Sequence, residues 1–197
     1  MRSASSTPLG RTLARRAARL VGHRSLRDVS RAFPDDCSGL VRYVYSGAGI
    51  DLLAPTGHTG RRAAGGGSLS AELYRRARDR HLLRARPRPG DLVFFRDTYD
   101  RNRDGRRGDG ITHVGLVESV TSAGEVTFVH RLGSGIVRSK LDRRHPRLRR
   151  DGRHQVRNDV LRRQTSTDRA YLTGELLVGF ARPPPRTFGR RKAGASG

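Results

Sequence analysis

The chain has 197 residues, enough for one domain with a buried core and a short tail, and its mean hydropathy is low at -0.68. Its formal net charge is +23, and of its 41 basic residues only Lys140 and Lys192 are lysines. No run of residues approaches the roughly 18 apolar positions of a membrane-spanning helix. The single cysteine, Cys37, excludes an intramolecular disulfide.

The first elements are predicted to be short helices. Residues 10–22 place Leu13 and Leu20 on one face with arginines opposite, which predicts an amphipathic helix that ends at Gly22. The same arginines interrupt the apolar run that a signal peptide requires, so we expect no signal peptide here. A second short helix is predicted over residues 26–33, because Pro34 then breaks the chain.

The segment DDCSGLVRYVYSGAGIDL predicts the best-defined helix of the chain. Asp35 or Asp36 can cap it, and its buried face consists of Leu40, Val41, Val44 and Tyr45. The Pro- and Gly-rich residues 55–68 predict a flexible loop. Ser70 is then expected to cap a further helix that continues to about Leu83.

After this helix the pattern changes to that of β-strands. Residues 91–96 predict a strand, followed by a polar loop over 97–110. The segments THVGLVESV and GEVTFVHRL predict an antiparallel hairpin, SGIVRSKL a short additional strand, and residues 175–183 a final buried strand. Residues 182–197 predict a disordered basic tail.

Cys37 lies at the predicted start of a helix, where free N–H groups and the helix dipole favour an anion. A thiolate is expected to be stabilised there, and the thiolate is the nucleophilic form of cysteine. A neighbouring backbone N–H could then stabilise an oxyanion. The alternative is a buried structural thiol.

Two histidines can complete this chemistry. A thiol nucleophile needs a base, and His113 begins a strand that would hold an imidazole rigidly. His130 ends the paired strand, so it can orient His113 as the third member of a nucleophile, base and orienting group. The alternative for each is a hydrogen-bonded core histidine.

The motifs DDCSGLVRYVY, PRPGDLVFF, THVGLVE and GEVTFVHR, in this order, resemble the NlpC-type cell-wall peptidases. These are papain-like cysteine hydrolases related to the CHAP amidohydrolases. The resemblance covers roughly residues 22–141. It implies an α+β papain-like fold in which helices come first and the nucleophile helix packs on an antiparallel sheet. It also implies Cys37 as nucleophile, His113 as base and His130 as the third polar residue.

The resemblance further implies cleavage of an amide bond in peptidoglycan peptides, with Asp36 and Ser38 binding the free amine of the substrate. It implies a location in the cell envelope or outside the cell, and we expect a monomer. The expected organisation is a basic helix in residues 1–21, a catalytic domain over 22–181 and the tail from 182. The chain lacks the tyrosine that the family usually carries before the cysteine. Conversely, its residues 142–174, an arginine-rich insertion, have no counterpart in the family pattern.

A metal site has little support in the sequence. Neither C-x-x-C nor H-E-x-x-H spacing is present, so we expect no zinc and no cofactor. Asp100, Asn102 and Asp104 resemble the first half of a calcium loop, but Ile111 stands where the loop needs a bidentate glutamate. Asp109 could substitute in part, and an Asx-rich turn is the alternative.

The basic composition allows two further functions. Residues 143–163 contain nine arginines against two acids, which predicts a solvated surface lobe; the functional alternative is contact with an anionic polymer. One alternative function is therefore a non-catalytic domain that binds such a polymer in the envelope. The other is a thiol-dependent acyltransferase, which would need a long apolar channel leading to Cys37.

Overall fold

The protein is described by a computed structural model that covers residues 7–54, 67–164, 169 and 171–185. Its helices are α1 (Pro8–Ala18), α2 (Cys37–Ser46), α3 (Leu69–Asp79) and the short α4 (Thr173–Leu176), with a 3-10 turn at Leu26–Asp28. Its strands are β1 (Leu83–Arg84), β2 (Leu92–Arg96), β3 (Ile111–Val120), β4 (Val126–Leu132), β5 (Gly135–Leu141), β6 (Val160–Arg162), β7 (Tyr171–Leu172) and β8 (Leu177–Ala181). The predicted α+β class is confirmed.

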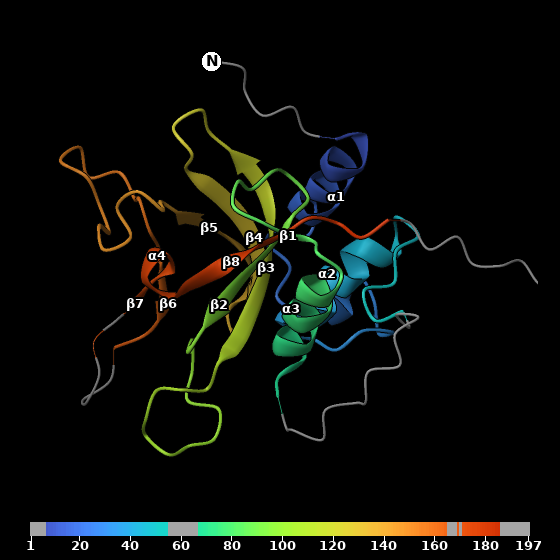
Figure 1. Cartoon of the computed structure of the whole chain (residues 1–197), viewed down its shortest axis with the longest axis horizontal. Helices are drawn as coiled ribbons and strands as arrows, with labels where there is room; N and C mark the ends of the chain where they lie inside the picture. The colour runs from blue at the N-terminus through green and yellow to red at the C-terminus, as the bar shows by residue number, and fades with distance from the viewer. Residues whose placement is uncertain (1–6, 55–66, 165–168, 170, 186–197) are drawn as a thin grey trace, which may run out of the picture.

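Six strands form one antiparallel sheet in the order β1-β8-β2-β3-β4-β5, and β6 pairs with β7 in a separate ribbon. The predicted hairpin is β3–β4, and β5 extends it. Figure 1 shows α1, α2 and α3 together on one side of the sheet, with α4 and the β6–β7 ribbon on the other. No helix in the described part of the chain is long and apolar enough to cross a membrane.

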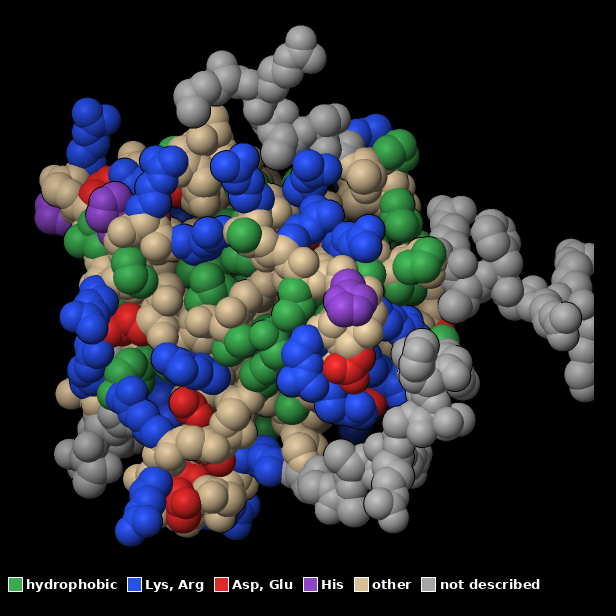
Figure 2. All heavy atoms as spheres, viewed as in Figure 1, with side chains coloured by type: hydrophobic (Ala, Val, Ile, Leu, Met, Phe, Trp, Pro, Cys, Tyr) green, Lys and Arg blue, Asp and Glu red, His purple; other side chains and the backbone are tan. Residues whose placement is uncertain are grey.

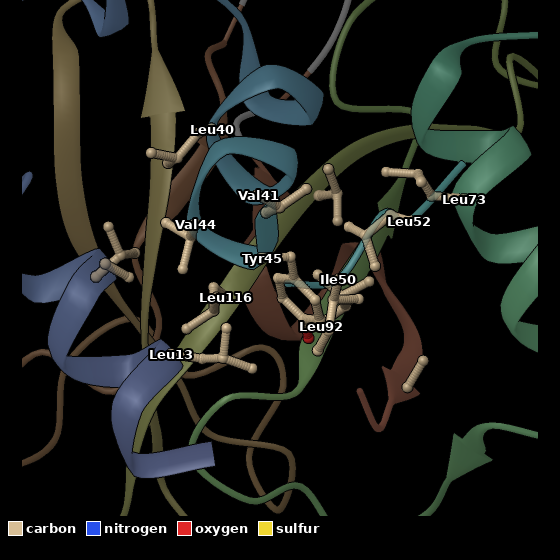
Figure 3. Close-up of a cluster of buried hydrophobic side chains, with 14 of the residues drawn as sticks. Leu13, Leu40, Val41, Val44, Tyr45, Ile50, Leu52, Leu73, Leu92 and Leu116 are labelled. Atoms are coloured by element: carbon tan, nitrogen blue, oxygen red, sulfur yellow. The ribbon is translucent and has the colours of Figure 1, made fainter. Parts of the chain in front are cut away.

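The helical side of the sheet carries the larger core. Helix α2 buries the predicted face, and Leu13 of α1 and Leu73 of α3 pack into the same cluster. Figure 3 shows these side chains converging with Leu92 of β2 and Leu116 of β3. The Tyr45 hydroxyl, fully buried here, donates a hydrogen bond to the Gly90 carbonyl at 2.7 Å. This bond ties α2 to the turn that enters β2.

The opposite side of the sheet is buried as well, by the arginine-rich insertion. Val93 and Phe95 of β2 pack there with Leu161, Tyr171 and Leu176. Strand β2 is therefore apolar at consecutive positions because both its faces are covered. The described part of residues 142–174 thus contributes to the cover of the second face, together with α4.

Several predicted boundaries were wrong. Helix α1 ends at Ala18, before Gly22, and residues 26–33 form only the 3-10 turn. Helix α3 ends at Asp79 because His81 adopts a left-handed φ of 53°, which turns the chain so that β1 pairs with β8. The final strand begins at Leu177 because the preceding residues form α4. Most of the predicted loop at 55–68 and most of the tail lie outside the described residues.

The start of α2 is held against the segment before it by Gly39. A Cβ at Gly39 would overlap the carbonyl oxygen of Pro34. We expect Gly39→Ala to lower the free energy of unfolding by about 1–3 kcal/mol, because the backbone must move apart. Thermal unfolding measures this, with Gly152→Ala as control because open space surrounds its Cβ. Equal melting temperatures for both variants would contradict this close approach.

Candidate active site

Cys37 is the first residue of α2, as predicted. Asp36 caps the helix: its Oδ1 accepts hydrogen bonds from the Gly39 N–H at 2.8 Å and from the Ser38 hydroxyl at 2.6 Å. The capping interpretation of Asp36 is therefore confirmed. Within the described chain, Asp36 Oδ2 has no hydrogen bond, so one carboxylate oxygen beside Cys37 is available to a ligand.

The thiol itself is partly buried and faces Ser70. Its Sγ lies 3.5 Å from Ser70 Oγ. Burial raises the pKa of the Cys37 thiol, while the Ser70 hydroxyl and the backbone N–H of Val114 partly offset this rise. The prediction of a thiol activated at rest by the helix start was wrong in direction, because desolvation outweighs the nearby donors. Cys37 is therefore a neutral thiol in the resting protein.

The two histidines are joined as the hairpin predicted. His113 Nε2 lies 2.8 Å from His130 Nδ1, and His130 Nε2 lies 3.0 Å from Ser139 Oγ. Both bonds are satisfied in the tautomer in which His113 donates through Nε2 to His130 and His130 donates through Nε2 to Ser139. The Nδ1 of His113 then carries a lone pair, so this imidazole can act as a base.

Both imidazoles are buried among aromatic rings on the second face of the sheet. His113 pairs with Phe95 across β2 and β3, and the His130 ring centroid lies 4.7 Å from that of Phe128. Burial lowers the pKa of His113 to about 4, while the Asp36 charge opposes the shift. Burial also lowers the pKa of His130. Both histidines are neutral at physiological pH.

A pocket of about 620 Å³ brings these groups together, and we name it the Cys37 pocket. No hydrogen bond joins Cys37 to His113 in the described structure, although both line this pocket. His130 lies behind His113 and is fully buried. The lining residues are Asp35, Asp36, Cys37, Ser38, Ser68, Leu69, Ser70, Thr98, Tyr99, Arg101, Thr112, His113, Arg131, Leu132, Gly133 and Leu161.

Sequence reasoning missed several of these residues. Asp35 does not cap α2; it binds Arg131 through two bonds of 2.9 Å, and this guanidinium holds the pKa of the Asp35 carboxyl well below its usual range. Ser70 was predicted to cap α3, but Ser68 does so and Ser70 contacts the thiol. Tyr99 enters the pocket from the loop after β2. Only the fold brings these distant positions together.

The loop after β2 does not form a metal-binding cluster. The side chains of Asn102 and Asp104 bond to each other and to loop N–H groups, as in an Asx-rich turn. Asp100 Oδ1 and Asp109 Oδ2 are buried without a hydrogen bond. Even so, the described residues contain no group of three or more His, Cys, Asp or Glu side chains placed to hold a metal ion.

The Ser70 hydroxyl is expected to set the reactivity of the thiol. Ser70→Ala should raise the pKa of Cys37 further, because a hydrogen bond to the thiolate is lost. The pH dependence of the iodoacetamide reaction rate measures this pKa. Ser70→Thr keeps a hydroxyl and should leave the profile close to that of the wild type. An unchanged profile in Ser70→Ala would show that the contact does not stabilise the thiolate.

The geometry agrees with a comparison against known families. No curated protein matches the chain. The model of the NlpC/P60 family, whose members are generally cysteine peptidases or amidases acting on the cell wall, matches residues 27–170. This match includes α2 with Cys37, the β3–β4 hairpin with the two histidines, and residues 142–170. The chain therefore belongs to the NlpC/P60 family.

Proposed function

We propose that the protein is a cysteine hydrolase that cleaves an amide bond in peptidoglycan peptides through an acyl-enzyme on Cys37. The observation that carries this proposal is that Cys37 and His113 line one pocket, with His113 held through Nε2 by His130. Family membership supports the cell-wall substrate. It also supports a place of action in the cell envelope or outside the cell.

Because the thiol and the imidazole are both neutral at rest, we propose general-base catalysis. Nδ1 of His113 takes the thiol proton as Sγ attacks the amide carbon, which gives a tetrahedral intermediate. In this proposal the Cys37 N–H, at the start of α2, stabilises the oxyanion of the intermediate. The intermediate then expels the amine, which receives the proton from His113. Water hydrolyses the resulting thioester with His113 again acting as base, which regenerates the thiol.

The proposed binding role of Asp36 and Ser38 rests on charge. Arg131 neutralises Asp35, so Asp36 is the carboxylate beside Cys37 that remains available to an ammonium group. Since Ser38 donates to Asp36 Oδ1, its hydroxyl oxygen can still accept a bond from the same amine. A peptide with a free amino terminus near the scissile bond therefore fits this end of the pocket.

The lining of the Cys37 pocket does not favour acyl transfer from a lipid. Three leucines are among its lining residues, and most of the others carry hydroxyl, carboxylate, guanidinium or imidazole groups. A long acyl chain would need a continuous apolar surface instead. A hydrophilic peptide suits this pocket better.

Removing the proposed catalytic groups tests the hydrolase. Cys37→Ala and His113→Ala should each lower turnover of a soluble muropeptide by roughly 10²–10⁴-fold or more, because each removes a group that acts on the reacting atoms. His130→Asn should cost less, because asparagine keeps an acceptor for His113 Nε2. Chromatography of the released peptides measures turnover. Full turnover in Cys37→Ala would contradict the acyl-enzyme.

The pH dependence tests the state of the base. The pKa of His113 is lowered to about 4, so the imidazole remains unprotonated and able to accept the thiol proton until the pH falls to that value. We therefore expect kcat/KM to fall on the acid side near pH 4. A solvated histidine would give an acid limb near ~6.5 instead. A limb at that higher value would contradict the buried neutral base.

A further inference from the structure

A second cavity of about 510 Å³ lies apart from the Cys37 pocket. Four arginines line it from separate parts of the chain: Arg96 ends β2, Arg107 belongs to the following loop, Arg147 to the insertion, and Arg169 precedes β7. We name it the arginine cavity. Figure 2 shows basic side chains gathered at the lower left of the molecule, where Figure 1 places this loop and β7.

The arginine cavity has a framework that orients its cations. The Tyr171 ring, only 5% exposed, carries the Arg107 guanidinium at 3.8 Å from its centroid and the Arg169 guanidinium at 4.8 Å. Guanidinium groups stacked on a ring present their N–H edges in a restricted plane. Two of the four cations are therefore partly fixed before any ligand arrives.

The turn that carries Arg147 is also held firmly. Asn158, fully buried, donates from Nδ2 to the carbonyl oxygens of His145 and Leu148, both at 2.9 Å. A Cβ at Gly174 of α4 would collide with the backbone of Pro146 in the same turn. This wall of the cavity is thus a packed part of the structure, in contrast to a free surface arginine.

The acids of the arginine cavity do not neutralise it. Glu175 pairs with Arg169 and accepts the Leu172 N–H, and Asp97 accepts the Gly108 N–H. The guanidinium groups of Arg96 and Arg147 have no partner among the described residues. Among the described lining residues, Arg96 and Arg147 are therefore the cations that an anionic ligand would pair with.

We propose that the arginine cavity binds a phosphate group of an anionic polymer, namely one polyol-phosphate or sugar-phosphate unit. A phosphodiester offers acceptors in several directions, which suits guanidinium groups converging from several segments. The cavity volume exceeds that of a bare phosphate, which leaves room for the adjoining polyol or sugar. Arg96 and Asp97 line this cavity, and Thr98 and Tyr99 line the Cys37 pocket. A polymer held here would keep the protein beside its substrate.

Binding is measured with purified poly(glycerol phosphate) on the full chain, by titration calorimetry at several salt concentrations. Arg96→Gln/Arg147→Gln should weaken binding by at least about tenfold and reduce the slope against the logarithm of salt concentration by about two, since two ion contacts are lost. The control Arg149→Gln/Arg153→Gln removes the same charge outside the cavity. It should change affinity less than about threefold. Equal losses in both double variants, or none in the first, would overturn the proposal.

Two further probes identify the ligand. Inorganic phosphate alone should bind much more weakly than the polymer; equal affinity per phosphate would overturn the polymer assignment in favour of a small phosphate compound. An oligothymidylate that binds as tightly as the polymer, with the same sensitivity to Arg96→Gln/Arg147→Gln, would overturn it in favour of nucleic acid. Turnover of a soluble muropeptide is scored separately, so failure of this proposal and failure of the hydrolase remain distinguishable.

Discussion

Burial of the central sheet on both faces is the constraint on which the rest of the structure depends. Helix α2 packs on one face, whereas His113 and His130 belong to the other, beside Phe95 and Phe128. From residues 142–174, Leu161 and Tyr171 pack on that second face in the same cluster as Phe95 and Phe128. An arginine-rich segment can do this because a few apolar residues, such as Leu161, point inward while its cations remain solvated.

The same burial determines the chemistry of the pair. Desolvation penalises a charge on either the thiol or the imidazole, so it raises the pKa of Cys37 and lowers the pKa of His113. A resting thiolate–imidazolium pair would have to overcome both penalties. In the proposed reaction the charges therefore develop only as the thiol attacks, when the start of α2 and the hydrogen bond between His113 and His130 can stabilise them.

Local sequence predicted the elements that depend on local physics. The periodicity of α2, the cap at Asp36 and the hairpin that joins His113 to His130 all follow from short-range patterns. The thiol pKa could not be predicted in this way, because the helix start is visible in the sequence whereas the burial that outweighs it comes from packing. Ser70 was likewise hidden, since its contact with Cys37 depends on how α3 lies against α2.

The excess of arginine has different consequences at different places. Arg131 forms an ion pair with Asp35, and Arg157 forms ion pairs with Asp151 and Glu125. These cations therefore stabilise the fold and contribute little to the electrostatic potential around the protein. Arg96 and Arg147 have no ion-pair partner among the residues that the structure describes, and both line the arginine cavity. The segment 142–174 therefore contributes to both places, since Leu161 lines the Cys37 pocket and Arg147 lines the arginine cavity.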